Sequence, residues 1–305
     1  MLIAVDHGNY AIKTVNHTFV SGLAEHSTRP PMTDEVLEYD GRFWALSGQR
    51  ISYMKDKTKD ERFFILTLFA IAKEMWNLSS GPVSEPVDLA VGLPPEHYGL
   101  LRNTFSQYFK RREPVRFTYN DRPFTITVRN VLVYPQAFAA IAPYKSRLNQ
   151  YLRVFLVDIG GYTTDVLLLR SGKPDMQFCR SLETGVITMD NDIIRRVGAL
   201  HDMRIEDEHI SAVLTGRETI LPEGVIKTIR ETAAQHAKDI LDKLRELQVD
   251  LRSNPAVFIG GGSLLYRRYL EDSPLVAQGI FLDEVNANAA GYQTLAQAQL
   301  SSRHT

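Results

Sequence analysis

The stretch Asp158-Ile159-Gly160-Gly161-Tyr162-Thr163-Thr164-Asp165 lies between two apolar runs in the segment from Arg153 to Arg170. Two such runs joined by a short turn that contains glycine predict a β-hairpin. Glycine lets the backbone turn tightly and approach a ligand closely, so that amide N–H groups can point at phosphate oxygens. The stretch therefore predicts a phosphate-binding turn that opens the second half of the chain.

A similar turn opens the first half. The apolar run 2–6 ends in Asp6 and is followed by His-Gly-Asn-Tyr. Taken alone this segment is also an ordinary β-turn. A carboxylate beside a phosphate is repulsive unless a cation intervenes, so Asp6 and Asp158 together predict a bound metal. Mg²⁺ keeps much of its water shell and needs few protein ligands, which suits two carboxylates. Lys13 would add a positive charge on the phosphates.

A third glycine-rich segment follows the predicted strand 256–259. It comprises Gly260, Gly261, Gly262 and Ser263 and leads into a helix. A Rossmann-like dinucleotide loop is an alternative here, but the segment lacks the G-x-G-x-x-G spacing and lies near the C-terminus. Since both halves begin with an apolar strand, an aspartate and a glycine turn, the larger pattern predicts two similarly built domains.

The remaining elements indicate an α/β protein. The sequence predicts a hairpin at 36–46, a buried helix at 63–76, a strand at 87–93, a helix opened by 94–96, strands within 115–135 and a long amphipathic helix at 223–247. These elements alternate along the whole chain, so neither an all-helical nor an all-strand fold is expected.

The composition excludes several classes of protein. The chain has 305 residues, 44% of them hydrophobic, which excludes a disordered or fibrous chain. A net charge of −1 gives no general attraction to nucleic acid, so contact with DNA is expected only through a partner. One cysteine allows no disulfide within the chain. The start resembles no signal peptide, and the apolar stretch 63–72 is too short to span a bilayer. We therefore expect a cytoplasmic protein without membrane contact.

Five segments, in this order, resemble the superfamily of actin, the heat-shock chaperone ATPases and the sugar kinases. They are similar to its first phosphate loop (2–13), first connecting helix (133–140), second phosphate loop (158–165), adenosine loop (258–263) and second connecting helix (286–291). Within that superfamily, segments 8–13 and 91–94 are similar to the bacterial ParM and StbA plasmid-segregation proteins, and the length agrees with theirs.

The resemblance implies an actin-like fold, with two related α/β domains, a smaller subdomain inserted in each and the nucleotide in the cleft between them. The first domain is expected at 1–150 with an insertion at about 21–86. The second is expected at 151–305 with an insertion at about 189–252. Its C-terminal helix would return toward the first domain.

The resemblance also implies roles for individual residues. The β-phosphate would be contacted by Gly8, Asn9 and Tyr10 from one side and by Gly160, Gly161, Tyr162 and Thr163 from the other. The adenosine would pack on residues 260–263, with Gly185 near the sugar and Lys227 and Arg230 near the adenine. Gln136 would orient the attacking water. ParM proteins are usually acidic in that region, and glutamine cannot accept a proton as a carboxylate does, so Asp165 is the alternative.

The implied function is a polymerising ATPase that binds ATP, or GTP in its place, together with Mg²⁺. Its partners would be further copies of itself and a DNA-binding adaptor of the ParR kind, used in plasmid segregation. Two alternatives within the superfamily remain open. A small-molecule kinase needs a carboxylate base beside a substrate pocket, and a chaperone-like reactivating ATPase normally carries an extra substrate-binding region.

Overall fold

The computed structural model describes residues 1–302 of the chain and divides it into two compact units. Unit 1 comprises Met1–Pro143 and the segment from Asn286 onward, and unit 2 comprises Tyr144–Val285. The first unit boundary lies between Pro143 and Tyr144, whereas the sequence predicts 150/151, and the segment from Asn286 onward belongs to unit 1. Across the described residues, no helix combines the length and the apolar character that crossing a bilayer requires.

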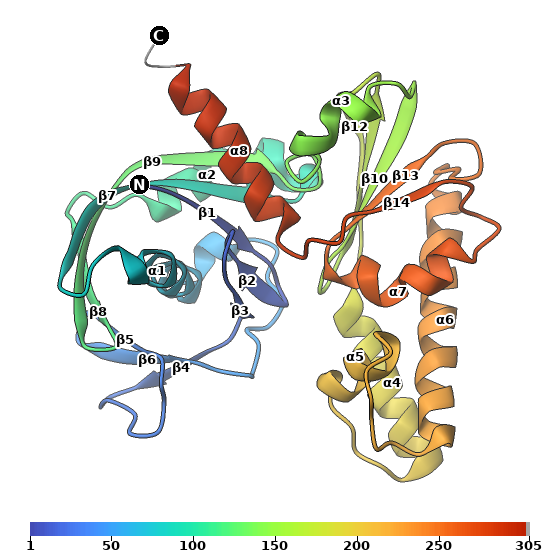
Figure 1. Cartoon of the computed structure of the whole chain (residues 1–305), viewed down its shortest axis with the longest axis horizontal. Coiled ribbons are helices and arrows are strands. Elements are labelled where there is room, and N and C mark those ends of the chain that lie inside the picture. Colours follow the sequence, from blue (N-terminus) through green and yellow to red (C-terminus); the bar gives the residue numbers. More distant parts are fainter. Residues whose placement is uncertain (303–305) are drawn as a thin grey trace. The chain divides into compact units, whose positions relative to one another are not determined.

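Unit 1 is built on a nine-stranded sheet in the order β3-β2-β1-β7-β9-β8-β5-β6-β4. Its elements are β1 (Leu2–His7), β2 (Ala11–Lys13), β3 (Thr18–Val20), β4 (Leu23–His26), β5 (Val36–Tyr39), β6 (Arg42–Leu46), α1 (Arg62–Met75), β7 (Val83–Leu93), α2 (Pro95–Phe109), β8 (Val115–Tyr119), β9 (Arg122–Pro135) and α8 (Ala287–Ser301). The end strands β3 and β4 are joined by only two residues, so the sheet curls into a ring around α1 (Figure 1). The enclosed position explains why α1 is buried along its length, as its apolar sequence predicts.

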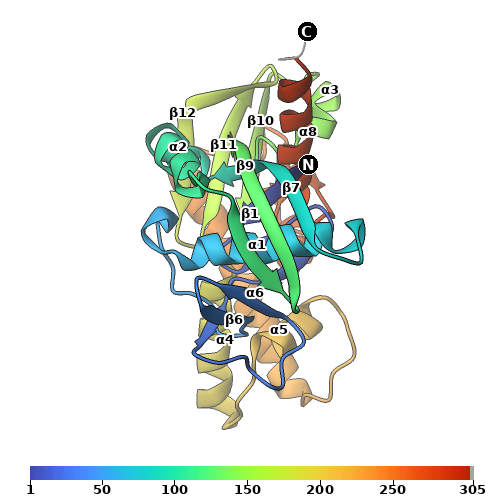
Figure 2. The same ribbon diagram turned by 90° about the vertical axis from the view of Figure 1, so that its left-hand side faces the viewer.

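Two hairpins of unit 1 confirm the predictions for 36–46 and 115–135. Asp40 and Gly41 join β5 to β6 with φ angles of 53° and 70°. Asn120 and Asp121 join β8 to β9 with φ angles of 47° and 63°. Positive φ at both central residues is the turn that suits the right-handed twist of a hairpin. The longer strands β7 and β9 pair in parallel and lie side by side in Figure 2.

The alternation of side chains along β1 divides its residues between two cores. Ile3 and Val5 belong to the core around α1, whereas Ala4 belongs to a smaller core with α8. Because successive side chains point to opposite faces of a strand, Asp6 lies on the α8 face and His7 on the α1 face. Strand parity thus brings the predicted metal ligand next to the C-terminal helix.

The predicted connecting helix at 133–140 is wrong. Strand β9 continues to Pro135, and the backbone N–H of Gln136 still donates to the Leu93 carbonyl of β7, at 2.8 Å. The next residue, Ala137, has a φ of 58°, a left-handed conformation that cannot continue a right-handed helix. Gln136 therefore lies in a turn directly after a strand, not at a helix start. The helix predicted at 286–291 is confirmed as the beginning of α8.

Unit 2 has a five-stranded sheet in the order β12-β11-β10-β13-β14. Its elements are α3 (Lys145–Leu148), β10 (Arg153–Ile159), β11 (Thr164–Arg170), β12 (Lys173–Leu182), α4 (Val186–His201), α5 (Asp207–Leu214), α6 (Glu223–Glu246), β13 (Ala256–Ile259), α7 (Gly261–Glu271) and β14 (Gly279–Phe281). Strands β10, β11 and β12 are antiparallel neighbours, and β13 and β14 continue the sheet in parallel. Residues of α4, α5, α6 and α7 form one core with this sheet.

Strand parity has the same consequence in unit 2. Val157 and Ile159 of β10 belong to the core under the helices, so Asp158 between them lies on the opposite face. Asp165 of β11 stands directly opposite Asp158 in the register of the hairpin. The predicted hairpin of 153–170 is confirmed, and it carries both carboxylates on one face of the sheet.

Candidate functional site

The turn between β1 and β2 is held by side chains from elsewhere in unit 1. The Ser21 hydroxyl donates to the Gly8 carbonyl oxygen at 2.7 Å, and the backbone N–H of Ser21 donates to the Tyr10 carbonyl at 3.1 Å. The Lys57 ammonium group donates to the His7 carbonyl oxygen. The Arg50 guanidinium lies over the Tyr10 ring, 4.6 Å from its centroid. These contacts fix the conformation of residues 7–10.

Asp6 is 3% exposed and shares one carboxylate oxygen between two donors. Its Oδ1 accepts from Nε2 of Gln136 at 2.7 Å and from the Tyr292 hydroxyl at 3.3 Å. Lys13 stands opposite Asp6 in the antiparallel pairing of β1 and β2. The structure thus brings together Asp6, Lys13 and Gln136. The sequence analysis assigned these residues to the metal, the phosphates and the attacking water, respectively.

His7 faces away from Asp6, into the core around α1. Burial, and secondarily the positive charge of Lys57, lower the pKa of His7 to about 3, so the ring is neutral at physiological pH. The Thr67 hydroxyl donates to the Phe63 carbonyl, so Nε2 of His7 donates to Thr67 Oγ1 at 2.8 Å. The ring also stacks on Phe109, with centroids 5.1 Å apart. The first turn therefore begins at an uncharged, packed residue.

The turn between β10 and β11 is held mainly by backbone hydrogen bonds. The Gly160 N–H donates to the Thr163 carbonyl at 2.8 Å, which closes the turn. Gly185 donates to the Tyr162 carbonyl at 2.9 Å. The first N–H groups of α4, from Val186 and Ile187, donate to the carbonyls of Gly160 and Gly161 at 3.1 and 2.7 Å. These hydrogen bonds join the N-terminus of α4 to the turn, and Gly185 lies directly against the turn.

Asp158 and Asp165 are 7% and 6% exposed and face each other across the hairpin. The Thr163 hydroxyl donates to Oδ2 of Asp165 at 3.0 Å. Like charges directly opposite each other on one face of a sheet are destabilising. A divalent cation bound at this face would offset that repulsion.

The third glycine segment lies directly against Asp158. Gly260 has a φ of 86°, and a Cβ there would stand 2.5 Å from Oδ1 of Asp158, so glycine is required. The Ser263 hydroxyl donates back to the Gly260 carbonyl at 2.7 Å, as α7 begins. A Cβ on Gly261 would meet no heavy atom within 4 Å. The N-terminus of a helix attracts anions, and here it follows a turn with space beside it.

Lys227 and Arg230 are less well supported as ligand contacts. Lys227 pairs with Glu231 on its own helix, at 3.8 Å with both side chains largely exposed. Arg230 lies near Tyr269 of α7. Burial raises the pKa of the Tyr269 hydroxyl above its ordinary value, and the positive charges of Arg268 and Arg230 partly offset that increase. Within residues 1–302, the structure gives neither Lys227 nor Arg230 a hydrogen bond to a glycine turn. Their proximity to an adenine stays a prediction.

The carboxylates fit Mg²⁺ better than a tightly coordinated transition metal. In the described part of the chain, no group of three or more His, Cys, Asp or Glu side chains could hold a metal ion. Mg²⁺ is often bound through one or two carboxylates together with waters and substrate phosphates. Asp158, with Asp165 opposite and the Gly260 turn against it, offers such a donor set in unit 2. Asp6 offers a single buried carboxylate in unit 1.

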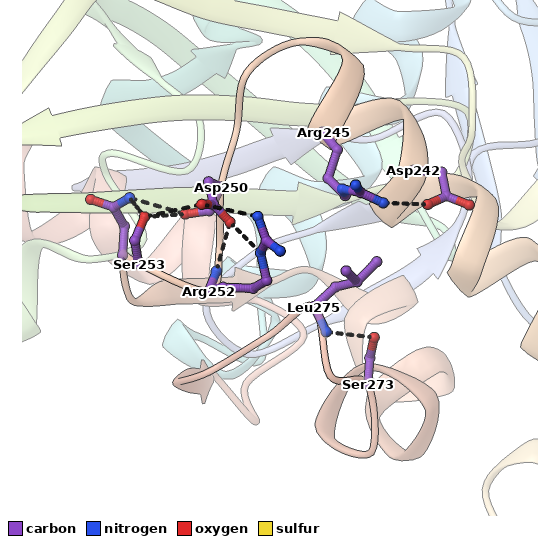
Figure 3. Close-up of polar contacts among 8 residues, drawn as sticks. Asp242, Arg245, Asp250, Arg252, Ser253, Ser273 and Leu275 are labelled. Carbon is purple, nitrogen blue, oxygen red and sulfur yellow. Dashed lines mark hydrogen bonds and ion pairs between the residues drawn. The ribbon is translucent and has the colours of Figure 1, made fainter.

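A hollow of about 730 Å³ lies elsewhere in unit 2, at the C-terminal end of α6. Its arginines are already paired, Arg245 with Asp242 at 3.6 Å and Arg252 with Asp250 at 2.9 Å (Figure 3). These charges offset each other, and none of the residues predicted from the sequence lines the hollow. We therefore do not assign the candidate site to it.

Several supporting residues escaped the sequence analysis. They are Ser21 and Lys57 on the first turn, Tyr292 on Asp6, and Asn288, whose Oδ1 accepts from the Ala137 N–H at 2.9 Å. Most lie far along the chain from the groups that they contact. One usable signal was Gly92 inside the strand 87–93, because glycine within a strand often marks the close approach of another group.

Family models match both halves of the chain. Residues 4–138 match the model described as "Actin like proteins N terminal domain". Residues 156–272 match the model described as "Archaeal actin homologue MreB-like, C-terminal". No curated protein matches the chain.

Solved structures extend the similarity over nearly the whole length. The archaeal actin homologue Ta0583 has a TM-score of 0.77 and 19% identity, covering 97% of this chain and 99% of its own. The psk41 ParM protein has a TM-score of 0.73 and 13% identity, covering 100% and 99%. A 15-stranded ParM filament from Clostridium botulinum contributes a chain with a TM-score of 0.74 and 17% identity, covering 97% and 99%. At these identities the likeness shows a shared fold.

Proposed function

Because the chain belongs to the actin-like proteins, we propose that it is an ATPase that assembles into filaments in response to nucleotide. The observation that carries the proposal is the same local construction in both units. Each unit has a buried aspartate near the end of a strand, Asp6 or Asp158, followed by a glycine turn. Such turns point backbone N–H groups at phosphates, and the adjacent carboxylate suits a metal that accompanies the phosphates.

The glycine turn of each unit is proposed to contact nucleotide phosphates. Gly8, Asn9 and Tyr10 would contact the phosphates, as would residues 160–163, and Lys13 would add a positive charge. The segment 260–263 and Gly185 would contact the nucleoside. Mg²⁺, ligated through Asp6 and Asp158, would neutralise the phosphate charge when bound. The choice of ATP rests on the family, and GTP is the alternative.

Gln136 is the residue proposed to orient the attacking water. Its Nε2 donates to Asp6 at 2.7 Å, which fixes the amide plane and turns Oε1 away from that contact. An amide oxygen accepts hydrogen bonds, so Oε1 could hold one hydrogen of a water molecule. A glutamine positions the water without removing its proton. Asp165 is the alternative, although its Oδ2 already accepts from Thr163.

The assembly part of the proposal is supported by similar proteins. The Clostridium botulinum structure is a ParM filament, the Alp12 structure is a filament, and Ta0583 has been solved in complex with ADP. We extend polymerisation and nucleotide binding from those proteins to this chain. A role in plasmid segregation would need a DNA-binding adaptor, since a net charge of −1 offers little attraction to DNA.

The test is to record phosphate release and light scattering in parallel after ATP and Mg²⁺ are added to the wild type and to Gln136→Ala. At saturating Mg²⁺ the variant should bind ATP and assemble, because the glycine turns are intact. Its phosphate release should slow by about 10²-fold, a barrier increase of about 3 kcal/mol. If hydrolysis loosens the polymer, its filaments should outlast those of the wild type.

Two results would contradict parts of this proposal. A wild-type protein that stays monomeric at tens of micromolar with either ATP or GTP would exclude polymerisation, and would favour a chaperone-like ATPase or a kinase. Normal phosphate release from Gln136→Ala would transfer the water-orienting role to Asp165.

A further inference from the structure

The C-terminal helix α8 covers the face of the unit 1 sheet that carries Asp6. It packs against β1 and β7 and shares a core with Ala4, Ala90 and Leu132. Because Ala4 and Ala90 have small side chains, the helix can approach β1 and β7 closely. Figure 1 shows α8 crossing over these strands. A helix more than 280 residues away along the chain thus lies over the candidate metal ligand.

Tyr292 is the residue through which α8 reaches Asp6. Its side chain is completely buried, and its hydroxyl donates to Oδ1 of Asp6 at 3.3 Å. The ring lies on Gly92 of β7, where a Cβ would stand 2.0 Å from the tyrosine oxygen. Any other residue at position 92 would displace the ring. The strand is therefore built to admit this tyrosine.

A second contact anchors the same helix to the loop that carries Gln136. Oδ1 of Asn288 accepts from the backbone N–H of Ala137 at 2.9 Å, at the residue whose φ is 58°. A left-handed alanine is strained, so it persists only where surrounding contacts determine it. Gln136 precedes it and donates to the same Asp6 oxygen as Tyr292. Helix α8 thereby supports both the carboxylate and the amide.

We propose that Tyr292 is a positioning residue that orients the Asp6 carboxylate toward Mg²⁺. The proposal rests on the proposed function, since it assumes a Mg²⁺-nucleotide site at Asp6. A carboxylate rotates about its terminal torsion unless its oxygens are held. With Oδ1 held by Tyr292 and Gln136, Oδ2 has a defined direction in which to meet the metal or its waters. Tyr292 itself would touch neither metal nor nucleotide.

The experiment compares Tyr292→Phe with Tyr134→Phe. Both variants remove one hydroxyl and keep the ring, and the two rings stack on each other with centroids 6.3 Å apart. The Tyr134 hydroxyl donates to Oε1 of Gln299 of α8 at 2.8 Å. Tyr134→Phe therefore controls for the loss of a hydroxyl that docks the same helix. Thermal unfolding of both variants monitors the fold.

The readouts are ATP affinity by calorimetry with Mg²⁺ and with EDTA, and the Mg²⁺ concentration that gives half-maximal phosphate release. Loss of a hydrogen bond to a charged group should raise this concentration by about threefold to tenfold in Tyr292→Phe. ATP affinity in EDTA should stay unchanged. Tyr134→Phe should leave both quantities unchanged.

The outcomes separate this inference from the proposed function. If Mg²⁺ strengthens ATP binding to the wild type and the two variants require equal Mg²⁺ concentrations, Tyr292 has no positioning role. If the wild type binds ATP equally well in EDTA, or binds no nucleotide, the proposed Mg²⁺ site is wrong and this inference falls with it.

Discussion

The two glycine turns occupy corresponding places in the two units but are stabilised differently. Around the turn of unit 1 the contacts come from side chains, among them Ser21, Lys57 and Tyr292. Around the turn of unit 2 they come mainly from the backbone, through the first N–H groups of α4 and the turn's own carbonyls. The residues facing the aspartates differ as well. Asp6 faces Lys13, whereas Asp158 faces Asp165.

This difference separates two ways of stabilising a glycine turn after a strand. Space limits a glycine at each turn, since a Cβ on Gly8 would stand 2.6 Å from the Ala11 carbonyl oxygen and one on Gly185 would stand 2.5 Å from the Gly161 carbonyl oxygen. A turn held by distant side chains should lose stability in smaller steps as single contacts are removed. The opposing charges of Asp6 and Lys13 offset each other without a metal, but two facing aspartates require a cation or another donor. We therefore expect unit 2 to carry more of the Mg²⁺ dependence.

The largest effect is expected from Gly260→Ala, in the third glycine segment, which follows β13 and lies against Asp158 of the unit 2 turn. A Cβ at this position would stand 2.5 Å from Oδ1 of Asp158, and the φ of 86° strains any L-residue. The free energy of unfolding should fall by about 3 kcal/mol or more. Denaturant unfolding without nucleotide measures it. Gly261→Ala is the matched control, because its Cβ would meet nothing within 4 Å. Equal losses in both variants would contradict a turn limited by space.

A smaller effect is expected in the pH dependence of the free energy of unfolding. It arises because Asp6 is followed by a titratable residue, His7, whereas Asp158 is followed by Ile159. The pKa of His7 is lowered to about 3 in the folded state, against an ordinary value of 6.5. Below pH 6.5 the unfolded chain therefore binds a proton that the folded chain does not, and stability falls as the pH falls. The loss is about 1.4 kcal/mol per pH unit between pH 6 and 4. His7→Ile should reduce the slope of unfolding free energy against pH by that amount. An unchanged slope would mean that His7 is protonated in the folded protein.

The smallest effect is expected from two serine substitutions. Ser21→Ala removes the donor at 2.7 Å from the partly buried Gly8 carbonyl oxygen, and should lower the free energy of unfolding by about 1–2 kcal/mol. Ser263→Ala removes an equally short bond to the Gly260 carbonyl, which still accepts from the Ser263 N–H at 3.1 Å. Ser263→Ala should lower the free energy of unfolding by about half as much as Ser21→Ala. Urea unfolding of the two variants measures the difference, and a larger loss for Ser263→Ala would reverse the comparison.

The sequence predicted most of the elements, and it predicted the backbone-held turn better than the other. Gly260 and Gly262 carry their own structural requirement, because a Cβ would stand 2.5 Å from Oδ1 of Asp158 at the first and 2.6 Å from the Ile159 side chain at the second. The side chains around Asp6 were not predictable in this way. Tyr292 and Asp6 are joined by the register of a sheet and the path of a helix, and no local pattern encodes that contact.

The error at 133–140 has a similar cause. The segment after Tyr134 has alanines that favour a helix, but the left-handed Ala137 ends any helix before it starts. That conformation is stabilised by Asn288, far away in the sequence. Local helix propensity was overridden by a tertiary contact, as often happens in short segments.

The most direct test of the account is Mg²⁺-dependent ATP binding, measured by calorimetry in the wild type, Asp158→Asn and Asp88→Asn. Asp88 is also a buried aspartate, but it pairs with Arg129 at 2.5 Å and lies outside both turns. The account predicts that Mg²⁺ strengthens ATP binding to the wild type and to Asp88→Asn, and that Asp158→Asn loses this enhancement. Unchanged Mg²⁺-dependent affinity in Asp158→Asn, or an equal loss in Asp88→Asn, would contradict it.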